Sequence, residues 1–583
     1  MMDQQPSNHQ SPASLLTLFS ISAGLVWWAM HMNFPLVDGR IDWFSALIYF
    51  MAGLFCLHTI IRLLENLSHY IDLLGSRKVS GQKGTSAWAK IKEYKDALTK
   101  DSGLFWGRAL DGSRLALFFD YVSNAMTVAP AGSGKGIYTV VIAIMSIRHS
   151  KVIADFKGEL SCMCKAALEK RGETVRVLNP GNLFSEVVGQ SDACNPLDMI
   201  ADDLTRPGGL RDVMDDLREM TGQILPEPDG KETDNSYFRE GSRRLIADAI
   251  LFEVMVDLYD ATLSSVALLI ENRQHLEDTA RWVAGVDIEG KSHQDGPLPI
   301  EQTEWAKLHD PQDVTEFSSL IRARAKNLIA LISGGDSRTF DSFITGAQQA
   351  LAPFAFGRLA PAMGRSNFSM NELKEGKQPT TLFIVADASR MEAYRAFIGL
   401  IQYCCMTALK RHPHKERSVY YILDEATNYK INGLESLLTW GRSYGLRLHL
   451  IFQDLAAFEK VYGKSALNTL LSETEIKQFL PGQRSPETLE LISKMLGEQS
   501  VMAIGASRSI EQPGLSENLS ETGRPLATPD EIRRMKNGIL FVRQHRPILF
   551  EPVSYAEIEP WRSQVGINPF HGKPFKKQVK IRL

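Results

Sequence analysis

A glycine-rich turn that ends in a lysine constrains the fold of this sequence more than any other feature. The turn reads Val128-Ala129-Pro130-Ala131-Gly132-Ser133-Gly134-Lys135-Gly136, after an apolar strand candidate and before a helix candidate that begins near Ile137. Such a turn lets backbone N–H groups converge on a phosphate chain at the positive end of a helix. We predict that residues 131–137 bind a nucleotide and that Lys135 reaches its outer phosphates as a point charge.

Two positions depart from the strict phosphate-binding pattern G-x-x-x-x-G-K-[ST]. Ala129 replaces the first glycine, and Gly136 replaces the hydroxyl residue that normally binds Mg²⁺, for which Thr139 is a weaker substitute. On these nine residues alone, a glycine-rich surface turn without a ligand stays open as the alternative.

A second motif supports the nucleotide site. The run Val419-Tyr420-Tyr421-Ile422-Leu423-Asp424-Glu425 is an apolar strand that ends in two adjacent carboxylates. We predict that Asp424 binds Mg²⁺ directly or through water, and that Glu425 orients and polarises the attacking water. A strand that ends in a solvated acidic turn is the alternative. The predicted cofactors are therefore ATP and Mg²⁺.

Two further residues are typical of an ATP-driven motor. Gln453 follows the strand candidate 448–452, and its amide is a candidate sensor of the γ-phosphate. Arg442 lies between this strand and the acidic pair, and it is a candidate arginine finger that reaches the ATP of a neighbouring subunit. For Arg442, an ordinary surface ion pair is an equally open interpretation.

Short β-rich runs alternate with helical patterns after residue 80, which predicts an α/β domain with a mostly parallel sheet. The candidate strands are 125–128, 152–154, 175–178, 381–385, 420–423, 448–452 and 539–542. Residues 201–375 are dominated by helical periodicity, so we predict an inserted all-α domain there. The nucleotide-binding domain then consists of residues 80–200 and 376–583.

Two long apolar runs predict a membrane anchor within residues 1–79. Residues 15–34 carry no full charge and residues 43–61 form a second such run. Each is long enough to cross about 30 Å of hydrocarbon as a helix. A cleaved signal peptide would need basic residues before the first run, and residues 1–14 contain no Lys or Arg. Two buried core helices are the remaining alternative.

Lysine and arginine residues near the ends of the two runs predict the orientation of the anchor. The N-terminal tail has none and the intervening loop has only Arg40. The residues that follow the second run are Arg62, Arg77, Lys78, Lys83, Lys90, Lys92 and Lys95. This excess places the C-terminal bulk of a multi-pass protein in the cytoplasm.

Charge and cysteine content decide little about function. A formal net charge of −3 leaves room for a local basic surface that handles DNA. The six cysteines are too few and too scattered for a disulfide framework or a zinc site, so we expect no metal cluster. A basic C-terminal tail either binds nucleic acid, anionic lipid or a partner, or is simply solvated. It contains Lys573, Lys576, Lys577, Lys580 and Arg582.

The order and spacing of several motifs resemble those of the coupling proteins of type IV secretion and conjugation systems, of the TraG type. The resemblance runs from the anchor nearly to the C-terminus. Its landmarks are Gly84-Thr85-Ser86-Ala87-Trp88-Ala89, Ser133-Gly134-Lys135-Gly136, Asp155-Phe156-Lys157-Gly158-Glu159, Asn179-Pro180, Asn195-Pro196, Leu423-Asp424-Glu425, Arg442-Ser443-Tyr444-Gly445 with Gln453, and Arg524-Pro525-Leu526. The resemblance also accounts for Gly136 and Ala129, because this family uses glycine after the P-loop lysine and tolerates the alanine.

The resemblance implies a RecA-like P-loop NTPase domain and an all-α domain in a homo-hexameric ring beneath the bacterial inner membrane. It implies that the ring recruits relaxase-bound single-stranded DNA (the relaxosome), or protein effectors, and delivers them to the type IV secretion channel by ATP hydrolysis. ATP lies between subunits in such rings, which fits Arg442 acting in trans. Two other functions stay open: a non-hydrolysing receptor platform for secretion substrates, and a double-stranded DNA pump of the chromosome-segregation type.

The segment Asp155-Phe156-Lys157-Gly158-Glu159 lies at a strand end beside the glycine-rich turn. This position favours a supporting role near phosphate or Mg²⁺. A helix-initiating loop that is stabilised by its own charges is an equally open interpretation.

Overall fold

The computed structural model describes most of the chain after residue 80. Single residues and short groups are described between 20 and 64, followed by 81–99, 103–227, 236–286, 299–334, 337–413, 416–428, 430–508, 515–572 and 578–583. Of the two predicted membrane helices, 15 of the 20 residues of 15–34 and 6 of the 19 residues of 43–61 lie outside these residues. Among the described residues, none of the helices combines the length and apolarity that a membrane span requires.

One large sheet of eleven strands organises the fold, in the order β2-β1-β13-β12-β9-β3-β8-β7-β4-β6-β5. Its strands are β1 (Leu104–Ala109), β2 (Ala116–Phe119), β3 (Asn124–Val128), β4 (Ser150–Asp155), β5 (Thr174–Leu178), β6 (Thr380–Val385), β7 (Val419–Asp424), β8 (Leu446–Phe452), β9 (Thr474–Phe479), β12 (Gly538–Val542) and β13 (Ile548–Glu551). The seven strands from β9 to β5 are parallel to one another. The remaining pairings, from β9–β12 to β1–β2, are antiparallel.

The parallel strands confirm the predicted α/β class and its mostly parallel sheet. Their sequences are nearly continuous apolar runs because helices cover both faces of the sheet; every residue of β3, β4 and β6 is buried. Since parallel strands end at the same edge, the carboxyl ends of β3, β8 and β7 lie together. This edge is where ligands bind in open α/β sheets.

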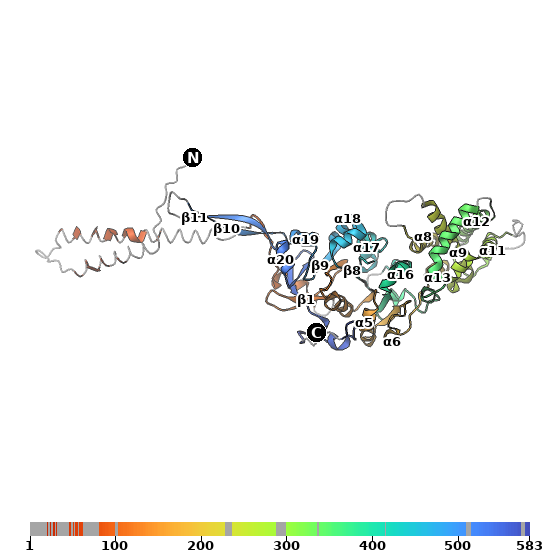
Figure 1. Cartoon of the computed structure of the whole chain (residues 1–583), viewed down its shortest axis with the longest axis horizontal. Helices are drawn as coiled ribbons and strands as arrows, with labels where there is room; N and C mark the ends of the chain where they lie inside the picture. Colours follow the sequence, from red (N-terminus) through yellow and green to blue (C-terminus); the bar gives the residue numbers. More distant parts are fainter. Residues whose placement is uncertain are drawn as a thin grey trace, which may run out of the picture. The chain divides into compact units, whose positions relative to one another are not determined.

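Helices flank the sheet on its two faces (Figure 1). On one face lie α4 (Val141–Ser146) and α5 (Glu159–Lys170), whose Ile142, Ile144 and Leu160 join a core with Ala125 and Ile153. The other long helices of the sheet region are α16 (Met391–Arg411), α17 (Leu434–Trp440), α18 (Leu455–Glu473), α19 (Pro486–Leu496) and α20 (Pro529–Arg534). Short helices are α3 (Ile91–Tyr94), α6 (Ser185–Val188), α14 (Leu359–Ala362), α15 (Glu372–Glu375) and α21 (Trp561–Gln564).

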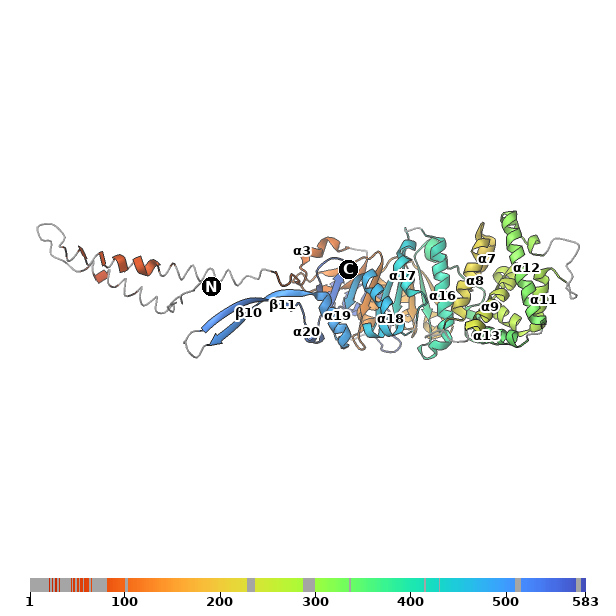
Figure 2. The same cartoon turned by 90° about the horizontal axis from the view of Figure 1, so that it is seen from above.

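The described residues between β5 and β6 are mainly helical. The helices are α7 (Asp198–Thr205), α8 (Val213–Ile224), α9 (Ser236–Asp257), α10 (Leu263–Glu271), α11 (Arg273–Ala284), α12 (Pro311–Ser333) and α13 (Ser337–Ala355). Helices α8, α9, α11, α12 and α13 lie side by side in both views (Figures 1 and 2). Gly241 of α9 permits the close packing of α9 against α13, because a Cβ at this position would lie 2.2 Å from the ring of Phe343 on α13.

Two smaller sheets complete the fold. Strands β10 (Glu498–Arg508) and β11 (Leu515–Pro525) form an antiparallel ribbon that belongs to a separate compact unit. Strands β14 (Ile558–Glu559) and β15 (Ile581–Arg582) are parallel. The last residues contact the domain: Lys580 forms ion pairs with Glu551 at 2.7 Å and Glu557 at 2.9 Å. Lys573, Lys576 and Lys577 lie outside the described residues.

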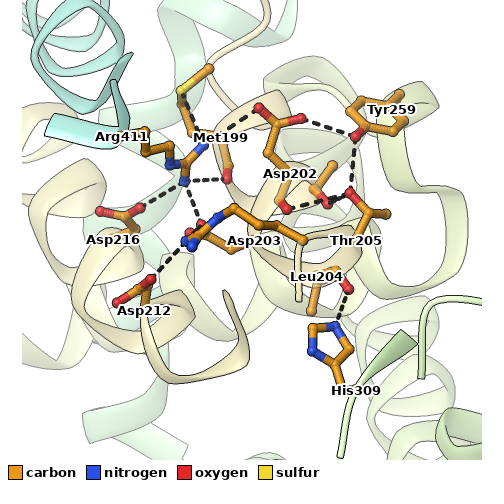
Figure 3. A network of polar contacts seen from close by, with 12 residues as sticks. Met199, Asp202, Asp203, Leu204, Thr205, Asp212, Asp216, Tyr259, His309 and Arg411 are labelled. Carbon is orange, nitrogen blue, oxygen red and sulfur yellow. Dashed lines mark hydrogen bonds and ion pairs between the residues drawn. The ribbon is translucent and has the colours of Figure 1, made fainter. Parts of the chain in front are cut away.

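A buried cluster of charges joins α16 to α7 and α8 (Figure 3). Arg411, the last residue of α16, contacts Asp203 of α7 at 2.5 Å and Asp216 of α8 at 3.1 Å. It also donates to the main-chain oxygen of Met199 at 2.9 Å. Asp203 is fully buried. Burial raises the pKa of Asp203 to about 7, and the neighbouring Asp216 carboxyl adds to this, while Arg411 opposes it.

Replacing Asp203 by asparagine is expected to flatten the pH dependence of stability. A carboxyl whose pKa is higher in the folded than in the unfolded chain stabilises the fold fully below the unfolded value of about 4, and this contribution is lost as pH rises through about 7. The wild-type melting temperature should therefore fall between pH 5.5 and 8, by an amount that reflects roughly 2 kcal/mol. Asp203→Asn removes the titration and keeps an acceptor for Arg411. Asp215→Asn, an exposed change on α8, should retain the wild-type slope; equal slopes in all three proteins would contradict the assignment.

Candidate nucleotide-binding site

The glycine-rich turn follows β3 at the carboxyl edge of the sheet. Gly132 and Gly134 have φ values of +79° and +78°, a left-handed conformation that glycine adopts without steric cost. The backbone N–H groups of Gly132, Gly134 and Lys135 have no hydrogen-bond partner among the described residues. These donors are what a phosphate chain requires from such a turn.

A single π-helical turn, η2 (Gly136–Val140), continues the chain into α4. The N–H groups of Ile137 and Tyr138 both donate to the oxygen of Gly134, at 3.0 and 2.9 Å. A Cβ on Gly136 would meet no atom within 4 Å, so the position of the missing hydroxyl is open. The Thr139 hydroxyl is buried and donates to Gln478 Oε1 at 3.4 Å. It faces the sheet, which leaves Asp424 as the candidate metal ligand.

Lys135 connects the turn to the acidic pair that follows β7. Its Nζ lies 3.0 Å from Asp424 Oδ1 and 2.6 Å from Glu425 Oε1. Burial alone would lower the pKa of Lys135, but the two carboxylates raise it above its usual value. Burial raises the pKa of Asp424, against the effect of Lys135. For Glu425, burial is outweighed by Lys135, Lys157 and Asn428, which hold its pKa below the usual value.

Glu425 adopts a left-handed backbone conformation, with φ of +58°. For a residue other than glycine this costs about 1 kcal/mol or more. Two contacts hold it there: Asn428 N–H donates to the Glu425 main-chain oxygen at 2.8 Å, and the Asn428 side-chain amide donates to Glu425 Oε2. Asn428 therefore orients the carboxylate. Sequence reasoning misses Asn428; its signal is an amide three residues after the acidic pair.

The segment 155–159 lies at the end of β4 and at the start of α5. Asp155 is buried and accepts hydrogen bonds from the N–H and hydroxyl of Ser161, at 2.8 and 2.9 Å, at the start of α5. Burial raises the pKa of Asp155 to about 6, against these hydrogen bonds. The charges of Lys157 and Glu159 act on Glu425 and Asp424, respectively. Asp155 thus holds the first turn of α5 through Ser161, and the charges of its neighbours act on the acidic pair.

The structure places Gln453 and Arg442 at opposite ends of β8. Gln453 follows Phe452, whose main-chain oxygen accepts from Ala129 N–H at 2.8 Å, so the exposed Gln453 lies at the edge of the glycine-rich turn. Arg442 lies in the helical turn η8 (Gly441–Tyr444) before β8 begins. Its side chain is exposed and has no ion pair or hydrogen bond among the described residues. One chain therefore brings together Lys135, Asp424 and Glu425, with Gln453 nearby, but not Arg442.

The side-chain amide of Gln483, in the segment after β9 (Thr474–Phe479), also supports the turn, and sequence reasoning misses it. Leu480 N–H and the Gln483 side-chain amide both donate to the oxygen of Val128, each at 3.0 Å. Gln483 is buried, and its Oε1 has no hydrogen-bond partner among the described residues. Its sequence signal is weak, because the polar residues of Thr474–Phe479 conceal the strand before it.

Replacing Gly134 by alanine is expected to weaken nucleotide binding about tenfold or more. The new Cβ would lie 2.7 Å from the Tyr138 ring, at a φ of +78°, so the turn must change shape. Gly172→Ala is the matched control, since Gly172 has φ of +89° and open space around its Cβ; it should cost stability and leave binding unchanged. Titration with a fluorescent ATP analogue measures both. Equal affinities in the two variants would show that the shape of this turn does not matter.

Comparisons with known proteins match most of the chain to proteins of conjugative DNA transfer. A family model described as type IV secretory system conjugative DNA transfer matches residues 78–572. Conjugal transfer protein TraG of Escherichia coli is 27% identical over 460 residues, which cover 74% of this chain and 65% of that protein. Protein VirD4 of Rhizobium radiobacter is 23% identical over 504 residues, 83% of this chain and 65% of that protein. The matches thus span slightly less than two thirds of these relatives.

Solved structures share the fold. The bacterial conjugative coupling protein TrwBdeltaN70 is 17% identical, with a TM-score of 0.51 over 82% of this chain and 96% of that one. The plasmid coupling protein TrwB in complex with the ATP analogue ADPNP also has a TM-score of 0.51, at 16% identity, over 80% of this chain and 94% of that one. At this level of identity the likeness establishes the fold and not the activity.

Proposed function

This chain belongs to the type IV secretory system conjugative DNA-transfer family, and we propose that it couples ATP hydrolysis to the delivery of single-stranded DNA, with or without bound protein, to a secretion channel. The contact of Lys135 with both Asp424 and Glu425 carries this proposal. A receptor that only holds a nucleotide would not need a strained carboxylate at the end of β7.

The residues of the turn fit ATP and Mg²⁺. The unpaired N–H groups of Gly132, Gly134 and Lys135, together with the Lys135 ammonium, would hold phosphates, and Asp424 would hold the metal. A solved neighbour in complex with an ATP analogue supports this assignment. When bound, ATP and Mg²⁺ supply the phosphoryl group and the Lewis acid that neutralises its charge.

Glu425 is the candidate base or water-positioning group. Its lowered pKa keeps the carboxylate ionised at neutral pH, so it can accept a hydrogen bond from water throughout the physiological range. Asn428 and Lys135 fix its two oxygens. Lys135 also compensates the charge of Asp424, whose side chain is only 14% exposed.

We assign the active form to a homo-hexameric ring in which Arg442 completes the site of a neighbouring subunit. Its exposed side chain lies at the opposite sheet edge from its own glycine-rich turn, so it can act only in trans. Arg442→Ala should abolish hydrolysis and retain ATP binding. Mixing this variant with Lys135→Ala should restore part of the activity, because a mixed interface pairs an intact turn with an intact arginine; mixtures without activity would contradict the assignment.

The anchor belongs to the same proposal. The apolar runs 15–34 and 43–61 and the basic residues that follow them favour two membrane helices in the bacterial inner membrane, with the C-terminal bulk in the cytoplasm. Protease added to intact inner-membrane vesicles of known orientation tests this. Cleavage only on the cytoplasmic face is expected, and cleavage on the opposite face would reverse the topology.

Transfer of DNA between cells tests the proposed function against its alternatives. In cells that depend on this chain for conjugation, Glu425→Gln should abolish transfer, whereas a non-hydrolysing receptor for DNA or protein effectors would be unaffected. A double-stranded DNA pump is separated by a binding assay, since it would prefer duplex to single strands. The channel proteins and the relaxosome are the partners that this proposal implies.

A further inference from the structure

Residues of four helices that are distant in sequence from the glycine-rich turn line an open cavity. It has a volume of about 1120 Å³ and is lined by residues of α8, α9, α12 and α13. This volume slightly exceeds the usual range of small-molecule sites, roughly 300–1,000 Å³. None of its lining residues belongs to the candidate nucleotide site described above.

The cavity has an excess of positive charge. Four arginines line it, and two of them are already paired: Arg243 contacts Glu227 at 2.6 Å and Glu240 at 3.4 Å, and Arg324 contacts the buried Asp248 at 2.5 Å. The guanidinium groups of the other two, the exposed Arg218 on α8 and Arg244 on α9, have no hydrogen bond or ion pair among the described residues, and the charge of Arg244 acts on Asp248 from a distance. Both lining carboxylates, Glu240 and Asp248, are therefore engaged, and two cationic groups remain for a ligand.

Part of the lining is apolar and aromatic. Tyr237 of α9 and Leu331 of α12 line the cavity and are accessible, at 64% and 41% exposure, over the buried Leu328, Phe340 and Phe343. The close approach at Gly241 holds the Phe343 ring against α9, with 2.2 Å between the ring and the position of a Cβ. A ligand here thus meets guanidinium groups and a preformed apolar wall.

We propose that this cavity binds a nucleotide unit, with its phosphate on Arg218 and Arg244 and its base against the apolar wall. Guanidinium groups match phosphate oxygens in geometry as well as charge, and bases pack on apolar and aromatic surfaces regardless of their sequence. An acidic side chain would satisfy the arginines but leave the apolar wall empty. The nucleotide belongs either to a free molecule or to single-stranded DNA, and in the second case the inference rests on the proposed function.

Binding by the full chain with Lys135→Ala, which weakens the first nucleotide site, tests this inference. The probes are a fluorescent mononucleotide and a fluorescein-labelled oligothymidylate of eight residues. Arg218→Ala with Arg244→Ala should weaken binding of one probe about tenfold or more. The matched control is Arg338→Ala, an exposed arginine of α13 that does not line the cavity, and it should leave affinity unchanged. Melting temperatures should be nearly equal, because Arg218 and Arg244 are exposed and their guanidinium groups make no hydrogen bond or ion pair among the described residues.

The two probes distinguish the source of the ligand. A loss confined to the oligonucleotide assigns the cavity to the transported strand, and a loss confined to the mononucleotide assigns it to a free nucleotide. Unchanged affinity for both probes in the double variant, or no binding of either probe to its parent, overturns the inference. The proposed function is judged separately, by whether single-stranded DNA stimulates hydrolysis in the wild-type chain.

Discussion

Replacing Lys135 by alanine is expected to reduce ATP hydrolysis roughly 100-fold or more. The Lys135 ammonium is the group that lies within 3.0 Å of both Asp424 and Glu425. Without it, two adjacent carboxylates face each other with no cation between them, and their mutual repulsion raises the pKa of one or both. Phosphates would then meet a net negative site. Steady-state phosphate release by the full chain measures the loss.

Lys157→Ala is the control for charge alone. Lys157 is exposed and lowers the pKa of Glu425 through its charge rather than as the contacting cation. Such exposed interactions are worth little, so hydrolysis should change by less than about threefold. If the two lysine variants lose activity equally, the site depends on general positive potential and not on the contact that Lys135 makes.

Glu425→Gln is expected to lower the maximal rate of hydrolysis by roughly 10²–10³-fold while nucleotide affinity is retained. Glutamine keeps the size of the side chain and an oxygen that accepts from Asn428, but it cannot take a proton. The variant should be slightly less stable than wild type at neutral pH, because the lowered pKa of Glu425 shows that its charge stabilises the fold. Equilibrium binding of a labelled ATP analogue, measured beside the hydrolysis rate, separates the two effects. A proportional loss of binding and rate would show that Glu425 holds the nucleotide and does not act on water.

Strands β3, β7 and β8, which carry the site residues, are predicted from the sequence. Strands β9, β13, β1 and β2, on one side of the sheet, are not. All seven predicted runs are strands, and six of them are parallel strands, which read as continuous apolar runs when helices cover both faces of the sheet. The sequence does not predict β9, where Glu475 and Lys477 alternate with apolar residues. Run 539–542 is a strand, but it is antiparallel as β12, a property that its composition does not specify.

The candidate site shows the same division. The adjacency of Lys135 and Glu425, which are 290 residues apart, follows from two recognisable motifs. The contributions of Asn428 and Gln483 depend on a left-handed residue and on a strand pairing, and neither leaves a pattern in sequence. The position of Arg442 at the opposite edge of the sheet also could not be predicted from the sequence, because it depends on where β8 begins. The arginine-lined cavity combines residues of four helices and has no sequence signal at all.

Hydrolysis of ATP by the full chain, with and without single-stranded DNA, tests the central claim most directly. We predict measurable hydrolysis that single-stranded DNA stimulates and that Lys135→Ala removes. The same preparation should be shown to contain assembled rings, since the proposed site is incomplete in one chain. Assembled rings that do not hydrolyse ATP under either condition would contradict the account and favour a receptor that binds secretion substrates without performing work.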